Sequence, residues 1–214
     1  MGTPPEITVS GFGLFSAQPA RIDVRRSSGP TGIRFVHPPT AGVVPASIAH
    51  QQPSGGPLGG RNTVIGDGRF SVATVEHLLS ALAGLGIWHA DVVTDAGELP
   101  ILDGSAAGFV AALRAARFSS QPPSEIRLTH PVRVEDAVTG AWIEARPANR
   151  LRYRYELLYP PGVGIPEQSF EWNGDPDRYA TEIAPARTFS LEREALAMKA
   201  AGLFPHLTPR DMLV

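Results

Sequence analysis

The chain of 214 residues is 43% hydrophobic and 19% charged, which is the composition of a globular protein long enough for two small domains. Its formal net charge is -2 with no cluster of basic residues, so we expect no nucleic-acid partner, and no apolar run approaches the roughly 18 residues of a membrane span, so we expect a cytoplasmic protein. There is no cysteine, which excludes disulfides, thiolate metal ligands and cysteine nucleophiles and leaves nitrogen and oxygen atoms as the ligands of any metal.

The first part of the chain is predicted to form β-strands. Apolar and polar residues alternate over residues 6–16 and 20–27, with glycine and proline nearby, as in a hairpin with a wide or bulged turn. Residues 31–39 and 42–50 extend this β region. The next segment, residues 51–62, is rich in glycine and proline and is predicted to be a loop that stays mobile unless a ligand orders it.

The spacing of apolar residues changes over residues 68–87 from a period of two to one of 3.6, which predicts a helix with one core-facing stripe. The stripe consists of Val75, Leu78, Leu79 and Leu82. Thr74 is the expected N-cap, because a threonine hydroxyl can accept a hydrogen bond from a free N–H group of the first turn. Gly84 or Gly86 is expected to end the helix.

A short strand over residues 89–97 and a second helix are predicted next. Residues 98–117 pass through a turn into that helix, with Asp103 or Ser105 as its cap. Residues 118–126 are polar and contain two adjacent prolines. This composition favours a domain boundary.

The second half of the chain begins the same plan again. Residues 126–136, 141–148 and 151–160 alternate like strands, and residues 186–203 have helical spacing. Residues 212–214 look like the opening of another strand.

We therefore predict an α+β fold of two domains, residues 1–118 and residues 124–214. The first would be a β-sheet with two helices. The second would have strands but only one helix, and by comparison with the first it would be incomplete.

Glu76 and His77 stand side by side in the first turn of the first predicted helix. Neighbouring residues of a helix point about 100° apart, so the two side chains could converge only on an external point near the helix N-terminus. That arrangement suits a metal-bound water, with His77 as a ligand and Glu76 as the base that takes its proton. The alternative is structural, because the helix dipole favours an acid in the first turn and a single histidine near a core is usually packed or capping.

Five motifs together carry a resemblance to a known family. They are SGFGLFS at residues 10–16, TGIRFV at 31–36, TVEHLLSALAGLGI at 74–87, ELPILDGSAAGFV at 98–110 and ARTF at 186–189. In this order the chain resembles the UDP-3-O-acyl-N-acetylglucosamine deacetylases, the zinc hydrolases of lipid A biosynthesis. The resemblance implies a sandwich of two similar α/β domains whose helices face each other, with the active site between them, a Zn²⁺ cofactor and a UDP-acyl-glucosamine substrate.

The resemblance also implies roles for individual residues. His77 would be a zinc ligand and Glu76 the general base, and Thr188 in the ARTF motif would help to stabilise the oxyanion. Phe189 would lie where the substrate and its acyl chain pass. From the residues alone, Thr188 could equally be the N-cap of the helix that follows it.

An acyl chain requires an apolar groove, which this family builds from an insertion in the second domain. The helix within residues 191–204 would supply it here, and core packing is the alternative role of its apolar residues. The candidate lining residues are Leu191, Leu196, Met198 and Leu203.

Two segments depart from the family's pattern. Phe15 stands where the first motif of the family ends in an active-site histidine, and residues 203–211, which include His206, replace a Gly-Gly-Ser turn. The other two zinc ligands of the family, in an H-x-x-x-D pattern, and a further catalytic histidine would lie past Val214.

A catalytic zinc site normally has three protein ligands, so we expect weak or no zinc binding and no deacetylation by these 214 residues alone. Two alternatives to an enzyme stay open. The chain could be a non-catalytic relative that acts as a binding or interaction module. It could also complete its second domain by self-association or with another chain.

Overall fold

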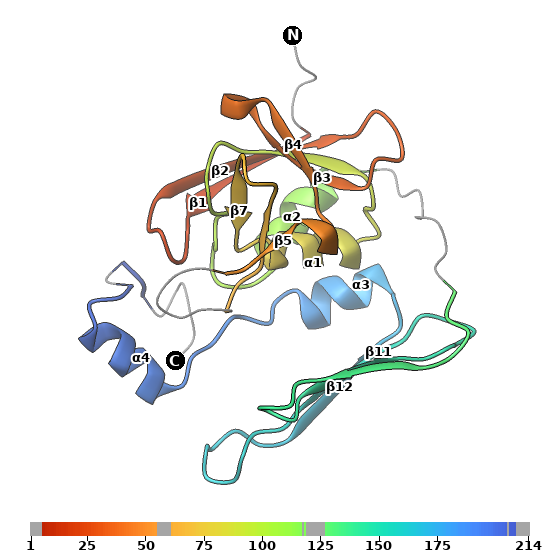
Figure 1. Ribbon diagram of the computed structural model, residues 1–214, viewed down its shortest axis with the longest axis vertical. Helices are drawn as coiled ribbons and strands as arrows, with labels where there is room; N and C mark the ends of the chain where they lie inside the picture. Colours follow the sequence, from red (N-terminus) through yellow and green to blue (C-terminus); the bar gives the residue numbers. More distant parts are fainter. Residues whose placement is uncertain (1–5, 55–60, 117, 119–126, 205, 209–214) are drawn as a thin grey trace. The chain divides into compact units, whose positions relative to one another are not determined.

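The computed structural model describes residues 6–54, 61–116, 118, 127–204 and 206–208. It contains helices and several β-sheets, which confirms the predicted α+β class (Figure 1). The chain forms two compact units, one made of Met1–Pro123 together with Pro176–Val214 and the other of Ser124–Asp175. The division into domains 1–118 and 124–214 stays a prediction.

A five-stranded sheet is the largest sheet of the first unit. Its strands are β1 (Ile7–Phe12), β2 (Pro19–Arg26), β3 (Ile33–His37), β4 (Gly42–Pro45) and β8 (Ala90–Val93). They lie in the order β1-β2-β8-β3-β4, and only β3 and β8 run parallel. Alternation buries one face, so Ile22, Phe35 and Val92 are 0% exposed. The strands predicted within residues 6–50 and 89–97 are thus confirmed.

Helix α1 (Glu76–Gly84) packs beneath this sheet in the view of Figure 1. The predicted apolar stripe is buried at Val75, Leu78 and Leu82, whereas Leu79 is only half-buried. Each buried leucine or valine contributes about 1.5–3 kcal/mol relative to an exposed one. The stripe therefore fixes which side of α1 faces away from the core.

The prediction that Thr74 caps α1 is wrong. The N-cap is Val75, which makes no side-chain hydrogen bond, and the Thr74 hydroxyl instead donates to the Glu98 carboxylate at 2.9 Å. A hydrogen bond to a carboxylate is roughly twice as strong as one between neutral groups, which favours the contact of the Thr74 hydroxyl with Glu98. The helix ends at Gly84 as expected, and Gly86 has the positive φ of 70° that glycine adopts without strain.

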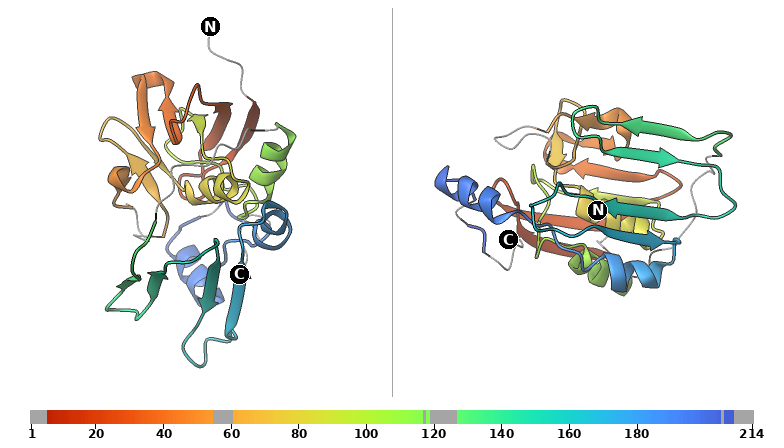
Figure 2. Two further views of the ribbon diagram at one scale, coloured as in Figure 1. Left: turned by 90° about the vertical axis from the view of Figure 1, so that its right-hand side faces the viewer. Right: turned by 90° about the horizontal axis from the view of Figure 1, so that it is seen from below.

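Helix α2 (Ala107–Ala115) packs against α1 (Figure 2). Its buried side chains are Phe109, Val110 and Leu113. The turn before it is tied by its own side chains: the Ser105 hydroxyl accepts the N–H of Ala107 at 3.1 Å, and the Asp103 carboxylate accepts the N–H of Ser105 at 3.0 Å. The prediction that Asp103 or Ser105 caps the helix is wrong, because the N-cap is Ala106, which makes no side-chain hydrogen bond; the two side chains order the turn before the helix instead.

A three-stranded antiparallel sheet precedes α1 in the chain. Its strands are β5 (Gln51–Gln52), β6 (Val64–Gly66) and β7 (Ser71–Ala73). Two short 3₁₀ helices, η1 (Pro38–Thr40) and η2 (Ile48–His50), precede it in the chain. Strand β7 ends three residues before α1 begins, so this small sheet helps to set where the helix starts. Residues 55–60 of the predicted loop lie outside the described residues.

The last part of the first unit is helical. Its elements are α3 (Pro176–Arg178), the π-helix η3 (Tyr179–Ile183) and α4 (Glu192–Ala200). Helix α4 confirms the helical spacing read from the sequence, whereas α3 and η3 were not predicted. None of the residues of α4 is buried. The strand expected at residues 212–214 falls outside the described residues.

The second unit consists of two antiparallel strand pairs. They are β9 (Val132–Glu135) with β10 (Trp142–Ala145), and β11 (Tyr153–Leu157) with β12 (Gln168–Trp172). The first three were predicted and β12 was not. Val134, Ile143 and Tyr155 are each more than 60% exposed, so these strands present apolar side chains to solvent.

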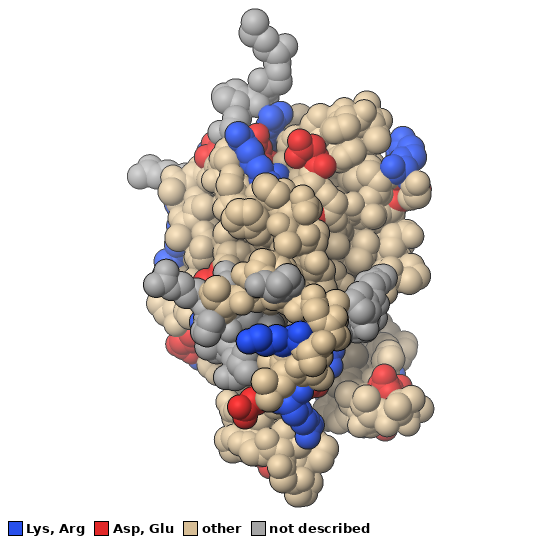
Figure 3. All heavy atoms as spheres, turned by 90° about the vertical axis from the view of Figure 1, so that its left-hand side faces the viewer, with Lys and Arg blue, Asp and Glu red and all other residues tan. Residues whose placement is uncertain are grey.

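Charged side chains do not gather by sign on the face drawn in Figure 3. Basic and acidic side chains there are scattered among uncharged ones. Within the part of the chain that the structure describes, every helix is too short or too polar to cross a membrane.

Candidate active site

Glu76 and His77 are both half-buried in the first turn of α1. The Oε2 atom of Glu76 accepts a hydrogen bond from the backbone N–H of Thr63 at 3.0 Å. Thr63 comes just before β6, so the small sheet orients the carboxylate. A backbone donor therefore holds this side chain in place.

His77 contacts a residue that lies 111 positions further along the chain. Its Nε2 atom is 3.2 Å from the Thr188 hydroxyl. Burial lowers the pKa of the His77 imidazole, while the nearby carboxylates of Glu76 and Asp103 raise it, and the net direction is downward. The neutral ring, which is the form that binds metals, is therefore favoured.

Thr188 is positioned by the turn that precedes α2. Its backbone N–H donates to the carbonyl of Gly104 at 2.6 Å, and the Arg187 guanidinium donates to the carbonyl of Asp103 at 2.5 Å. Two residues on from Gly104, the N–H of Ala106 donates to the carbonyl of Ala184 at 3.0 Å. The ARTF segment is thus hydrogen-bonded to the turn at residues 103–106, a contact that the sequence does not predict.

The reading of Thr188 as a helix cap is wrong. Helix α4 has Leu191 as its N-cap, and the Thr188 hydroxyl faces His77 instead. Phe189, the next residue, is 46% exposed. Among the candidate groove residues of α4 and its flanks, Leu196 is 60% exposed and the others are half-buried.

Tyr179 anchors the segment that leads to Thr188. Its side chain is 3% exposed, its hydroxyl lies 2.7 Å from the Ser80 hydroxyl, and its ring covers Gly84. Burial raises the pKa of the Tyr179 phenol, and the hydrogen bond with Ser80 opposes that shift. Because Tyr179 belongs to a π-helix, which is uncommon and often lies near a functional site, we regard it as part of the site's support.

Replacing Gly84 by alanine should destabilise the fold. A Cβ atom there would lie 2.3 Å from the Tyr179 ring, so the ring must move, and such overpacking costs about 1–3 kcal/mol. Alanine gains at most about 1 kcal/mol over glycine in a helix interior, and Gly84 is the last residue of α1, so the gain there is smaller than the cost. Urea unfolding measures the difference. A second variant with Tyr179→Leu should remove most of the penalty, and a Gly84→Ala protein more stable than the parent would contradict this packing.

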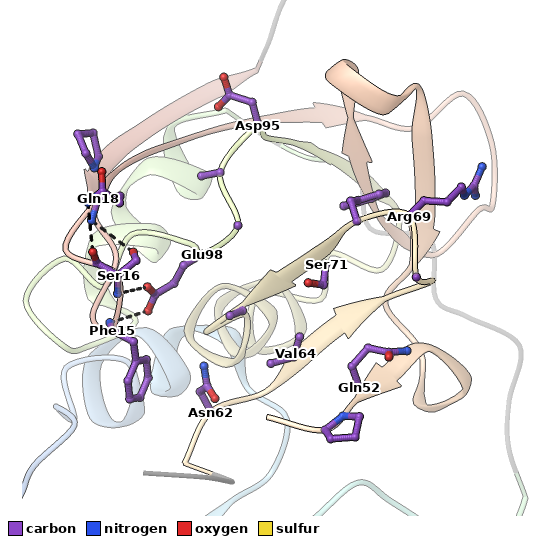
Figure 4. Close-up of a pocket in the computed structure, with 17 residues that line it drawn as sticks. Phe15, Ser16, Gln18, Gln52, Asn62, Val64, Arg69, Ser71, Asp95 and Glu98 are labelled. Carbon is purple, nitrogen blue, oxygen red and sulfur yellow. Dashed lines mark hydrogen bonds between the residues drawn. The ribbon is translucent and has the colours of Figure 1, made fainter. Parts of the chain in front are cut away.

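A cavity of about 1260 Å³ lies beside the start of α1, between the β1–β2 turn and the small sheet (Figure 4). Its lining includes Ser16, Gln18, Gln52, Asn62, Arg69 and Glu98, and it includes neither Glu76 nor His77. Glu98 reaches from the cavity wall to the β1–β2 turn, where its carboxylate accepts the backbone N–H groups of Phe15 and Ser16. No pattern in the sequence predicts that this glutamate is buried.

The two segments that depart from the motifs contact each other. The ring of Phe15 meets the ring of Phe204 edge-on, with centroids 5.5 Å apart. His206 places its Nε2 atom 3.1 Å from the carbonyl of Leu14, so this nitrogen carries the proton. Phe15 therefore packs against the segment that follows α4.

The described residues could supply one ligand of a zinc site. His77 offers a half-buried, neutral imidazole beside a carboxylate and a hydroxyl, which suits a metal ligand. Within the described residues, no three or more His, Cys, Asp or Glu side chains are grouped so that they could hold a metal. A complete site would need ligands from beyond the described residues.

Comparison with known proteins gives consistent relatives. A family model described as UDP-3-O-acyl N-acetylglycosamine deacetylase matches residues 4–214. A protein of Oleidesulfovibrio alaskensis is 36% identical over 200 residues, which are 92% of this chain and 63% of the relative. A protein of Psychrobacter cryohalolentis is 36% identical over 202 residues, which are 92% of this chain and 61% of the relative.

A third relative, from Acidithiobacillus ferrooxidans, is 35% identical over 202 residues, which are 91% of this chain and 63% of the relative. All three are named UDP-3-O-acyl-N-acetylglucosamine deacetylase. The chain spans a little over three fifths of the length of these relatives.

Proposed function

Because this chain belongs to the UDP-3-O-acyl-N-acetylglucosamine deacetylase family, we propose that it carries the general base and one metal ligand of a zinc-dependent amide hydrolase of lipid A biosynthesis. The observation that supports this most is the contact of His77 Nε2 with the Thr188 hydroxyl at 3.2 Å, next to Glu76. Residues from two distant motifs meet there with the chemistry that amide hydrolysis requires.

In this proposal His77 is the zinc ligand that these residues supply. Its burial keeps the ring neutral, so a nitrogen lone pair is available at neutral pH. When bound, zinc would supply a Lewis acid for the attacking water and the amide carbonyl.

Glu76 takes the proton of the attacking water. The N–H of Thr63 holds Oε2, which orients the carboxylate and leaves Oε1 to accept that proton. Water then adds to the amide carbon, the C–N bond breaks, and the protonated Glu76 returns its proton to the glucosamine nitrogen as acetate leaves.

Thr188 stabilises the oxyanion that forms on the carbonyl. Its hydroxyl is a donor, and the hydrogen bond from its N–H to the Gly104 carbonyl fixes the backbone before the reaction begins. Phe189 is exposed beside it, so its ring can contact the substrate. The exposed and half-buried apolar residues on α4 and its flanks would line the path of the acyl chain.

Acetate release from UDP-3-O-acyl-N-acetylglucosamine by the protein in its natural full length tests the proposal. We expect zinc-dependent release above a heat-inactivated control. A folded, zinc-loaded protein that releases no acetate would contradict it.

The packing of Phe15 against Phe204 favours a second candidate, a non-catalytic relative that binds the UDP-sugar. An apolar ring at this position cannot donate a hydrogen bond to the substrate. Calorimetry with the same substrate separates the two functions, because the module would bind it without releasing acetate.

A further inference from the structure

Glu98 is a buried carboxylate outside the proposed active site. Its side chain is 6% exposed, and its two oxygens accept three hydrogen bonds, from the N–H of Phe15 at 2.9 Å, the N–H of Ser16 at 2.8 Å and the hydroxyl of Thr74 at 2.9 Å. Figure 4 shows the bonds from the β1–β2 turn. A Cβ atom on Gly13 would lie 2.3 Å from Glu98 Oε2, so the carboxylate packs closely against the β1–β2 turn at a position where only glycine fits.

The residue that Glu98 holds is in an unusual conformation. Thr74 has a φ of 57°, which β-branched residues rarely adopt, and its side chain is 2% exposed. The preceding residue, Ala73, is fixed by its N–H to the Gly97 carbonyl at 2.9 Å and by its carbonyl to the Leu99 N–H at 3.0 Å. Such a conformation persists only where the surroundings impose it.

Two routes lead from Glu98 to the proposed base. Along the chain, Thr74 lies two residues before Glu76 and sets the direction in which α1 begins. Through space, the Thr74 hydroxyl accepts a hydrogen bond from the Asn62 amide at 3.3 Å, and the next residue, Thr63, donates its N–H to Glu76. Both routes pass through the Thr74 hydroxyl or its backbone.

We propose that Glu98 is a positioning residue: through Thr74 it fixes both the start of α1 and the Asn62–Thr63 segment that holds the Glu76 carboxylate. Glu98 makes no contact itself with Glu76 or His77 among the hydrogen bonds of the described residues. The catalytic meaning of this role depends on the proposed function of Glu76, whereas the structural linkage does not.

Hydrogen exchange of the Thr63 amide in the full chain tests the linkage, because that amide donates to Glu76. Thr74→Val removes the hydroxyl and keeps the side-chain shape. We expect the Thr63 amide to exchange about five to ten times faster and the amide resonances of Glu76 and His77 to shift. Thr74→Ser keeps the hydroxyl and should restore both readouts.

Val44→Ala is the matched control. Val44 is 1% exposed in β4, so its truncation destabilises the unit without touching Thr74 or Asn62. If Val44→Ala and Thr74→Val change Thr63 exchange equally at equal stability, the proposal is wrong. If Thr74→Val does not fold, Asn62→Ala replaces it as the test. Asn62 is half-buried, and its removal breaks the hydrogen bond to the Thr74 hydroxyl, so the Thr63 amide should again exchange faster. Unchanged exchange in Asn62→Ala would overturn the relay.

The outcome does not depend on acetate release. If the protein releases no acetate but Thr63 exchange responds as expected, the structural linkage is supported and the proposed deacetylase activity is wrong. If the protein releases acetate but Thr63 exchange does not respond, the proposed activity is supported and the positioning role of Glu98 through Thr74 is wrong.

Discussion

Glu76→Gln should lower the kcat of deacetylation about 10²–10⁴-fold, which is the range for loss of a positioned general base. Glutamine keeps an oxygen that can accept the N–H of Thr63, so the side chain should stay in place while losing its ability to take a proton. Initial rates of acetate release by the full-length protein measure the effect. Thermal unfolding of the same samples should show little change.

The matched control for this variant is Glu192→Gln. Glu192 is exposed in the first turn of α4, so it repeats the change of charge in the first turn of a different helix. Its kcat should equal that of the parent. A Glu76→Gln protein within threefold of the parent would mean that another group takes the proton.

Thr188→Val should lower kcat about 10²–10³-fold with little change in KM, the effect of removing one oxyanion donor. Valine fills the same volume but cannot donate, and the backbone bond to Gly104 stays intact. Thr188→Ser, which keeps the hydroxyl, should retain most of the activity. Steady-state kinetics of the two variants measure both effects.

Equal losses in Thr188→Val and Thr188→Ser would contradict the role of the hydroxyl. Such a result would show that the hydroxyl alone does not account for the role of Thr188 and that packing of its methyl group near His77 is also required. An increase in KM alone would place Thr188 in substrate binding instead.

Much of the fold could be predicted because it depends on local patterns. The alternation in β1 and β2 and the stripe of Val75, Leu78 and Leu82 each buries one face, and a face is visible within ten residues of sequence. Leu79 is less buried than expected because it lies at the edge of the stripe.

The elements that were missed depend on distant partners. Tyr179 lies in a π-helix whose burial requires the flat surface at Gly84, about a hundred residues earlier. The Thr74 hydroxyl donates to Glu98 instead of capping α1, and the position of Glu98 depends on the backbone path of residues 95–98. No propensity of Thr74 itself could predict this.

The candidate site was recognised unevenly for a similar reason. The adjacent Glu76 and His77 are visible as a pair in the sequence, whereas Thr188 could be assigned only through the resemblance to a family. The N–H of Thr63, which holds the Glu76 side chain, and the carbonyl of Gly104, which holds the Thr188 backbone, could not be predicted, because every residue has such backbone groups.

The zinc content of the full-length protein after dialysis tests most directly whether His77 is a ligand. We expect near-stoichiometric zinc in the parent and in His130→Gln, which changes an exposed histidine of the second unit, and at least a tenfold loss of zinc affinity in His77→Gln. A folded His77→Gln protein that retains the parent's zinc would contradict the assignment of the metal site to the start of α1.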